Sequence, residues 1–92
     1  MSSVLVRVHD VFRSLFDGRN EFSMRANSLR ELVEQLVTQE PTFSKHFVNR
    51  EGQLSQYNRI YVNEEDVRQL QNLDTPLKYG DEVTFIPAIP GG

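Results

Sequence analysis

The chain has 92 residues, of which 38% are hydrophobic and 25% are charged, and its formal net charge is -3. This length is that of one small domain, and the negative charge excludes the basic surplus that is typical of nucleic-acid binders. The absence of cysteine excludes disulfides, thiolate nucleophiles and cysteine-based metal sites, and it fits a reducing cytosol. No signal-peptide pattern is visible, and no apolar run approaches the ~18 residues of a membrane span. We therefore expect a cytoplasmic protein that binds neither nucleic acid nor a membrane.

Two short strands are predicted near the start of the chain. Residues 4–8 place their three valines on one face, as in a strand that is buried on one side. Asp17-Gly18 predicts a turn, and the phenylalanine-rich segment before it is either a short helical turn or a packed loop. Residues 21–26 alternate polar and apolar side chains, which predicts a second strand in a hairpin with the first.

An amphipathic helix follows the second strand. Ser28 and Glu31 have the spacing of a capping box, with the serine at the N-cap. Pro41 is expected to stop the helix. Between them, apolar residues recur at helical spacing and form one stripe, which consists of Leu29, Leu32, Val33, Leu36 and Val37.

The second half of the chain predicts two more strands, at residues 59–63 and 82–86. Residues 42–58 form either a short helix or a loop, and residues 64–78 a polar connection. Pro87 ends the last strand, since proline cannot continue a central ladder. A single amphipathic helix needs an apolar surface to cover, and a sheet supplies it. We therefore predict an α+β, β-grasp (ubiquitin-like) domain over residues 1–86, with a mixed sheet of four to five strands, one main helix on one face and a flexible tail over residues 87–92.

The body of the chain shows no pattern that is typical of catalysis. His9 and His46 lack the spacing of metal ligands, so packing or surface roles are favoured. Glu64, Glu65 and Asp66 lack the alternating ligands and the glycine of a calcium loop. No nucleophile elbow and no phosphate-binding glycine loop is present. We expect no catalytic residue, no metal and no bound cofactor, and hence a protein that is not itself an enzyme.

The last six residues, "PAIPGG", are the remaining candidate for chemistry. A carboxylate is a poor electrophile, but conversion to an acyl-adenylate at the expense of ATP makes it reactive. Gly91 and Gly92 lack a Cβ and therefore fit a narrow channel. The two prolines favour an extended backbone, which lowers the entropy lost on binding. Fully extended, the six residues would reach roughly 18 Å, and Ala88 and Ile89 offer apolar contact to a partner's groove.

The segment "YGDEVTFIPAIPGG" resembles the C-terminal signature of the ubiquitin-like sulfur carriers of the MoaD/ThiS family. The segment "RIYVNEEDVR" is similar to the longer branch of that family, which is typified by CysO. The resemblance implies that an adenylating enzyme of the E1/MoeB/ThiF type uses ATP to activate Gly92. A sulfur donor then displaces AMP and leaves a thiocarboxylate, while Gly91, Pro90, Ile89 and Ala88 thread into the partner's active site.

The resemblance also implies a surface for the activating enzyme at Ile86, with Phe85, Val67 and Arg13 as further candidates. Phe85 has an alternative role in the core, and Arg13 one as an exposed loop cation. The usual Pro-Pro-Val or Pro-Ala-Val segment is Pro-Ala-Ile here, and Pro90 replaces a small residue.

The expected partners after activation are a synthase that accepts the sulfur and a metallopeptidase that releases the product. A synthase that depends on pyridoxal phosphate and makes cysteine or a related metabolite is favoured. Three alternatives stay open from the sequence. They are the small subunit of a molybdopterin synthase, a ubiquitin-like modifier joined to proteins through Gly92, and a β-grasp interaction module with an inert tail.

Overall fold

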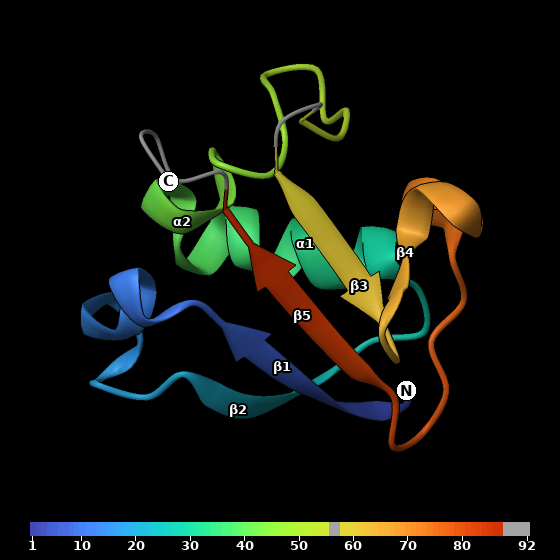
Figure 1. Cartoon of the computed structure of the whole chain (residues 1–92), viewed down its shortest axis with the longest axis horizontal. Coiled ribbons are helices and arrows are strands. Elements are labelled where there is room, and N and C mark those ends of the chain that lie inside the picture. Colours follow the sequence, from blue (N-terminus) through green and yellow to red (C-terminus); the bar gives the residue numbers. More distant parts are fainter. Residues whose placement is uncertain (56–57, 88–92) are drawn as a thin grey trace.

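The computed structural model describes residues 1–55 and 58–87 as a five-stranded mixed sheet with one main helix against one face (Figure 1). The strands are β1 (Ser3–Val8), β2 (Glu21–Arg25), β3 (Arg59–Val62), β4 (Glu65–Asp66) and β5 (Glu82–Ile86). Their order across the sheet is β2-β1-β5-β3-β4. β1 and β5 are parallel and the other pairs are antiparallel. The predicted β-grasp architecture is confirmed.

The main helix, α1 (Leu29–Gln39), begins at the predicted cap. The Glu31 backbone N–H donates to Ser28 Oγ at 3.2 Å. The Glu31 carboxylate accepts from the backbone N–H of Asn27 at 3.4 Å, one residue earlier than in a standard capping box. Both contacts satisfy donors that the start of a helix would otherwise leave unpaired.

The apolar stripe on α1 is narrower than the sequence predicts. Leu29, Leu32, Val33 and Leu36 are buried against the sheet, but Val37 is 45% exposed. At about 100° per residue, Leu32 and Val37 lie roughly 140° apart around the helix. The sheet covers the centre of that arc and leaves its edge at Val37 in solvent, which corrects the prediction that Val37 is buried.

Two short helices close the end of the core where β5 stops. These are η1 (Asp10–Phe16), a 3-10 helix, and α2 (Pro41–Ser44), which begins at the proline that ends α1. The helical alternative is thus confirmed for the segment before Asp17. In residues 42–58 only the first three residues are helical, and the described residues that follow form turns and a loop. The rings of these helices form one aromatic cluster with Phe47 and with Phe85 of β5. The centroid of the Phe43 ring lies 4.9 Å from that of Phe12, 5.2 Å from Phe16, 5.0 Å from Phe47 and 5.3 Å from Phe85.

A tight hairpin that the sequence analysis missed joins β3 to β4. Asn63 and Glu64 have φ of 51° and 72°, and a two-residue type I′ turn needs a positive φ at both positions. The Asn63 side chain donates to Asp81 at 2.8 Å and accepts from the Glu82 backbone N–H at 3.0 Å. These bonds attach the turn to the start of β5. Beyond it lie two more 3-10 helices, η2 (Val67–Gln69) and η3 (Asn72–Asp74).

Candidate functional site

The chain leaves the sheet from the end of its central strand. In the register of β5, Phe85 lies opposite Val8 of β1, and Ile86 lies opposite Arg59 of β3. Neighbouring strands on both sides therefore fix Phe85, and β3 alone pairs with Ile86. β5 lies between β1 and β3 in the sheet (Figure 1). The tail begins at Pro87, which is half-buried. The predicted reactive and threading residues Ala88, Ile89, Pro90, Gly91 and Gly92 lie outside the described residues.

The four residues that we predicted to form the partner surface occupy different environments. Ile86 is 42% exposed, as a contact residue requires. Arg13 is exposed on η1, where its Nε donates to the carbonyl of Gly18 at 3.2 Å. Because η1 directly follows β1, it lies beyond the same end of the sheet as the root of the tail (Figure 1).

Phe85 and Val67 are in the core, with only 1% exposure each. Successive side chains of a strand point to opposite faces, so Phe85 points inward where Ile86 points outward. The Phe85 ring lies 5.3 Å from that of Phe43 and 5.1 Å from that of Phe47. Neither Phe85 nor Val67 can offer its side chain to a protein docked on this fold, which corrects their placement on a contact surface. The core alternative for Phe85 is confirmed.

The outer face of the sheet, opposite α1, surrounds Ile86 with side chains that the sequence analysis did not select. Strand alternation places on this face Leu5 and Arg7 of β1, Arg59 and Tyr61 of β3, and Glu82 and Thr84 of β5. None of the described helices covers it, because α1 packs on the other face (Figure 1). The alternation of the predicted strands, applied to all three of them together, was the signal that could have found this set.

Charged side chains form a ladder across the outer face beside Ile86. Arg7 Nε lies 3.2 Å from a Glu21 carboxylate oxygen on β2, and Arg7 Nη2 lies 3.1 Å from a Glu82 carboxylate oxygen on β5. All three side chains are more than one-third exposed, so these ion pairs add little stability. Their geometric effect is to hold the arginine across three strands.

A shallow groove of about 330 Å³ lies between this ladder and the end of β5. It is lined by Arg7, Val8, His9, Asn20, Glu21, Thr84, Phe85 and Ile86. An exposed isoleucine next to fixed charges has the features of a protein contact surface, because apolar contact supplies affinity and charges set orientation. Arg13 and Val67 do not line this groove.

The two histidines have roles in local structure. His9 Nδ1 accepts from the backbone N–H of Val11 at 3.1 Å and caps η1. The His46 ring lies 5.3 Å from that of Phe12. Within residues 1–55 and 58–87, no three histidine or acidic side chains gather as a group that could hold a metal ion.

The three adjacent acids do not act together. Asp66 is bound to Arg59 at 3.2 Å and accepts from the Arg68 backbone N–H at 2.9 Å. Glu64 lies in the tight turn, and Glu65 is exposed on β4. These contacts give Asp66 a structural role.

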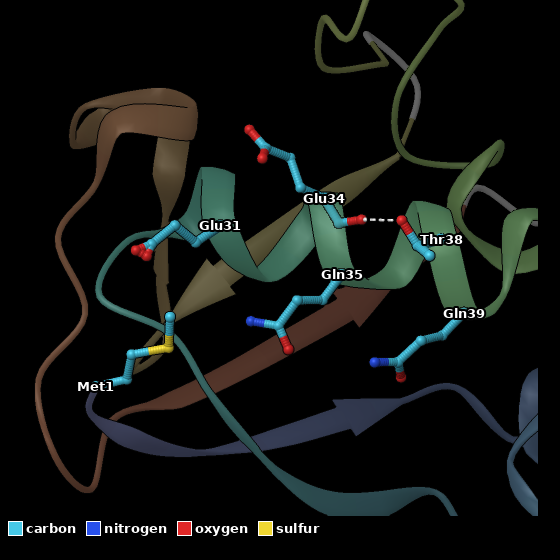
Figure 2. Close-up of a pocket in the computed structure, with 6 residues that line it drawn as sticks. All are labelled: Met1, Glu31, Glu34, Gln35, Thr38 and Gln39. Carbon is cyan, nitrogen blue, oxygen red and sulfur yellow. Dashed lines mark hydrogen bonds between the residues drawn. The ribbon is translucent and has the colours of Figure 1, made fainter.

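The outer flank of α1 carries a hollow of about 400 Å³ that lacks the character of an active site. It is lined by Met1, Glu31, Glu34, Gln35, Thr38 and Gln39 (Figure 2). Glu34 points to the opposite side of the helix from Gln35 and Gln39 (Figure 2). Thr38 donates to the Glu34 backbone carbonyl at 3.2 Å. These side chains fan out from the helix and do not converge on one point where a substrate could bind.

The ThiS family model matches residues 6–92. The chain belongs to the ThiS family. The sulfur carrier protein CysO of Mycobacterium tuberculosis is 30% identical to this ThiS-family chain over 92 residues, which cover 98% of this chain and 99% of that protein. The crystal structure of the mycobacterial protein matches with a TM-score of 0.81 over 94% of this chain and 99% of that one.

Two solved complexes are also similar to this member of the ThiS family. The Amycolatopsis orientalis BexX/CysO complex contains a chain with a TM-score of 0.84 and 27% identity, over 97% of this chain and 99% of that chain. The complex of subunits 1 and 2 of the Helicobacter pylori molybdopterin-converting factor contains one with a TM-score of 0.65 and 28% identity, over 98% and 99%. In each of them a protein of this fold is found with a second protein. Among the described residues of the present chain, no helix is long and apolar enough to cross a membrane.

Proposed function

We propose that this chain is a sulfur carrier of the CysO type and that the carboxylate of Gly92 is its reacting group. The observation that supports this most is the similarity to CysO over 98% of this chain, together with the match to the ThiS family model, which extends to Gly92. The described part of the chain supports it independently. The side chains with the chemistry for catalysis have structural roles or lie apart, and the central strand delivers the tail at one end of the sheet.

The proposed chemistry takes place in partner enzymes. An adenylating enzyme of the E1/MoeB/ThiF type joins the Gly92 carboxylate to the α-phosphorus of ATP, and pyrophosphate leaves. A sulfur donor at the oxidation level of hydrosulfide attacks the acyl carbon, the bond to the phosphate oxygen breaks, and AMP leaves. The product is a thiocarboxylate at Gly92. Gly91 and Gly92 keep this end slender, while Pro90, Ile89 and Ala88 hold an extended arm in the enzyme's channel.

We propose that the activating enzyme contacts the outer face of the sheet around Ile86. This side chain is exposed, follows directly from the strand that carries the tail, and lies next to the groove beside Arg7. Arg13 on η1 lies beyond the same end of the sheet and is retained as a peripheral contact. The buried side chain of Phe85, which also lines that groove, supports this surface from within.

The proposed acceptor is the precursor of cysteine or of a related metabolite, bound by a synthase that depends on pyridoxal phosphate. The thiocarboxylate sulfur forms a bond to the acceptor's carbon, the carbon–oxygen bond of an O-phosphoryl or O-acetyl group breaks, and phosphate or acetate leaves. The product stays attached to Gly92 through the acyl carbon. A metallopeptidase then hydrolyses that link, which releases the product and restores the carboxylate. The greater likeness to CysO than to the molybdopterin-converting subunit favours this acceptor, with a TM-score of 0.81 against 0.65.

The second candidate function is that of the small subunit of a molybdopterin synthase. The 28% identity to the Helicobacter pylori complex supports it. The two functions differ in the partner that binds stably, because a synthase subunit remains with its large subunit through purification. Affinity purification from the native host, followed by identification of stoichiometric partners, separates them.

The activation step is tested with ATP–pyrophosphate exchange by a candidate activating enzyme. Deletion of Gly92 is expected to abolish exchange, because the next carboxylate is one residue short of the nucleotide. Deletion of Met1, an exposed residue at the other end of the chain, is the matched control and is expected to leave exchange unchanged. Equal exchange with and without Gly92 would contradict the proposed function.

A further inference from the structure

The strand β2 leaves one backbone edge of the sheet open. Among residues 1–55 and 58–87 it pairs only with β1, and it is the first strand in the order across the sheet (Figure 1). The residues that flank β2 also bond to β1. The Val8 backbone N–H donates to the Asn20 carbonyl, and the Ala26 backbone N–H donates to the Ser2 carbonyl, each at 2.9 Å. Since bonded pairs recur at every second residue of an antiparallel ladder, Phe22 and Met24 also face β1.

The three other residues of β2 direct their backbone groups to the open edge. These are Glu21, Ser23 and Arg25. The carbonyl of Arg25 accepts from the side-chain amide of Gln35 at 2.7 Å and keeps a second lone pair. An open edge of this kind is a template for another strand.

The sequence of β2 is complementary to itself when it is read in the antiparallel direction. In "EFSMR", centred on Ser23, Glu21 of one copy lies opposite Arg25 of the other. Phe22 lies opposite Met24, and Ser23 lies opposite its own equivalent. Every residue that bonds in this register is one of the three whose backbone groups point outward. Opposite charges face each other at both ends, and like charges do not meet.

The inner side of the same edge offers apolar surface to a second copy. A groove of about 540 Å³ lies beside β2, between η1 and α1. Half of its lining residues are apolar, namely Leu15, Phe16, Phe22, Met24 and Leu36, and the other half are polar or charged. The ring of Phe22 stacks on that of Phe16 at 4.6 Å. In the self-paired register, Phe22 of one copy and Met24 of the other form a non-hydrogen-bonded pair, the type in which side chains come closest. They would extend this apolar surface across the junction.

We propose that β2 is a homodimerisation edge, at which two copies pair antiparallel about Ser23 and form one continuous ten-stranded sheet. The contact is a single short strand from each copy, so the dimer is weak and depends on concentration. β5 lies two strands away from the edge, which leaves Ile86 and the root of the tail accessible in each copy. The proposal does not depend on the proposed function, since it concerns the edge strand β2 and not the central strand that carries the tail. Glu21 is shared with the groove beside Ile86.

The test is a charge exchange read by sedimentation velocity, from about 10 μM to about 1 mM, the range of a weak interface. The wild-type chain is expected to shift from monomer to dimer over this range. Glu21→Arg and Arg25→Glu are each expected to raise the dissociation constant at least tenfold, because like charges then meet at both ends. An equimolar mixture of the two variants is expected to form a heterodimer, and the double variant E21R/R25E to recover the homodimer.

Two further variants separate the strand contact from other effects. Ser23→Pro removes a backbone N–H that faces the open edge and not β1, so it is expected to abolish the dimer while circular dichroism stays that of a folded chain. Glu34→Arg changes an exposed charge on α1 and is expected to leave the dimer intact. Glu21→Arg also removes the ion pair with Arg7, but the mixture contains the same change and is still expected to pair.

A wild-type chain that stays monomeric at 1 mM would overturn the proposal. An unchanged dissociation constant for Arg25→Glu would also overturn it, as would an equimolar mixture of the two charge variants that forms no heterodimer. If the chain is monomeric and the amide resonances of β2 shift only when the activating enzyme is added, the edge belongs to that partner and self-pairing is refuted.

Discussion

Phe43→Ala tests whether the aromatic cluster holds α2 against the end of β5. The Phe43 side chain is fully buried, and its ring contacts four other rings at centroid distances between 4.9 Å and 5.3 Å. One of these rings belongs to Phe85, the residue before Ile86 at the root of the tail. Removing the phenyl group leaves a cavity next to the strand that positions the tail.

The expected loss of unfolding free energy is about 4 kcal/mol, since phenylalanine-to-alanine changes in a core cost about 3–5 kcal/mol. The four ring contacts argue against the bottom of that range, because aromatic pairs contribute beyond the area that they bury. For a domain of this size, about 4 kcal/mol corresponds to a fall in melting temperature of roughly 15–30 °C.

The assay is thermal and urea unfolding followed by circular dichroism, with Val37→Ala as the control. Val37 is apolar but 45% exposed on α1, so its removal is expected to change stability by less than about 0.5 kcal/mol. A loss for Phe43→Ala below about 1.5 kcal/mol, the range of a shape-conserving swap, would refute the packing described for this end of the core.

Three other substitutions test separate parts of the structure. Ser28→Ala removes the side chain that caps α1 and is expected to lower the unfolding free energy by about 1 kcal/mol; an unchanged urea midpoint would contradict the cap. Glu64→Gly removes the steric strain of a side chain at a positive φ of 72° and is expected to raise the unfolding free energy by about 1 kcal/mol. A loss of stability would argue against the type I′ turn. Ile86→Arg is expected to weaken binding to the activating enzyme at least tenfold, measured by calorimetry, with little change in stability. Val37→Arg, at similar exposure on the opposite layer, is expected to bind normally, and equal loss in both variants would refute the contact surface.

The main elements could be predicted from the sequence because local signals and tertiary packing agree there. The cap at Ser28, the stop at Pro41 and the strand at Glu82–Ile86 all occur where local signals placed them. Strand β4 was not predicted, because it has only two residues and because the turn before it uses Asn63-Glu64 in place of the familiar Asn-Gly.

The surface around the tail was only partly predictable, because exposure depends on what packs on each side chain. The family resemblance placed Phe85 and Val67 on a contact surface, but it carries no information on burial, and both side chains are in the core. Val37 fits the helical period, but the sheet is too narrow to cover it. The ladder through Arg7 joins residues that are distant in sequence, so only the register of three strands reveals it.

Intact mass spectrometry of the chain purified from its native host tests the central claim most directly. A sulfur carrier is expected to show a fraction whose mass is raised by the exchange of one oxygen for sulfur. Fragmentation should place that exchange at Gly92, and treatment with an alkylating reagent should add one group there. The Gly92 deletion should show neither change. If the chain gains no sulfur when its activating enzyme and sulfur donor are present, or gains it anywhere other than at Gly92, the proposed function is contradicted.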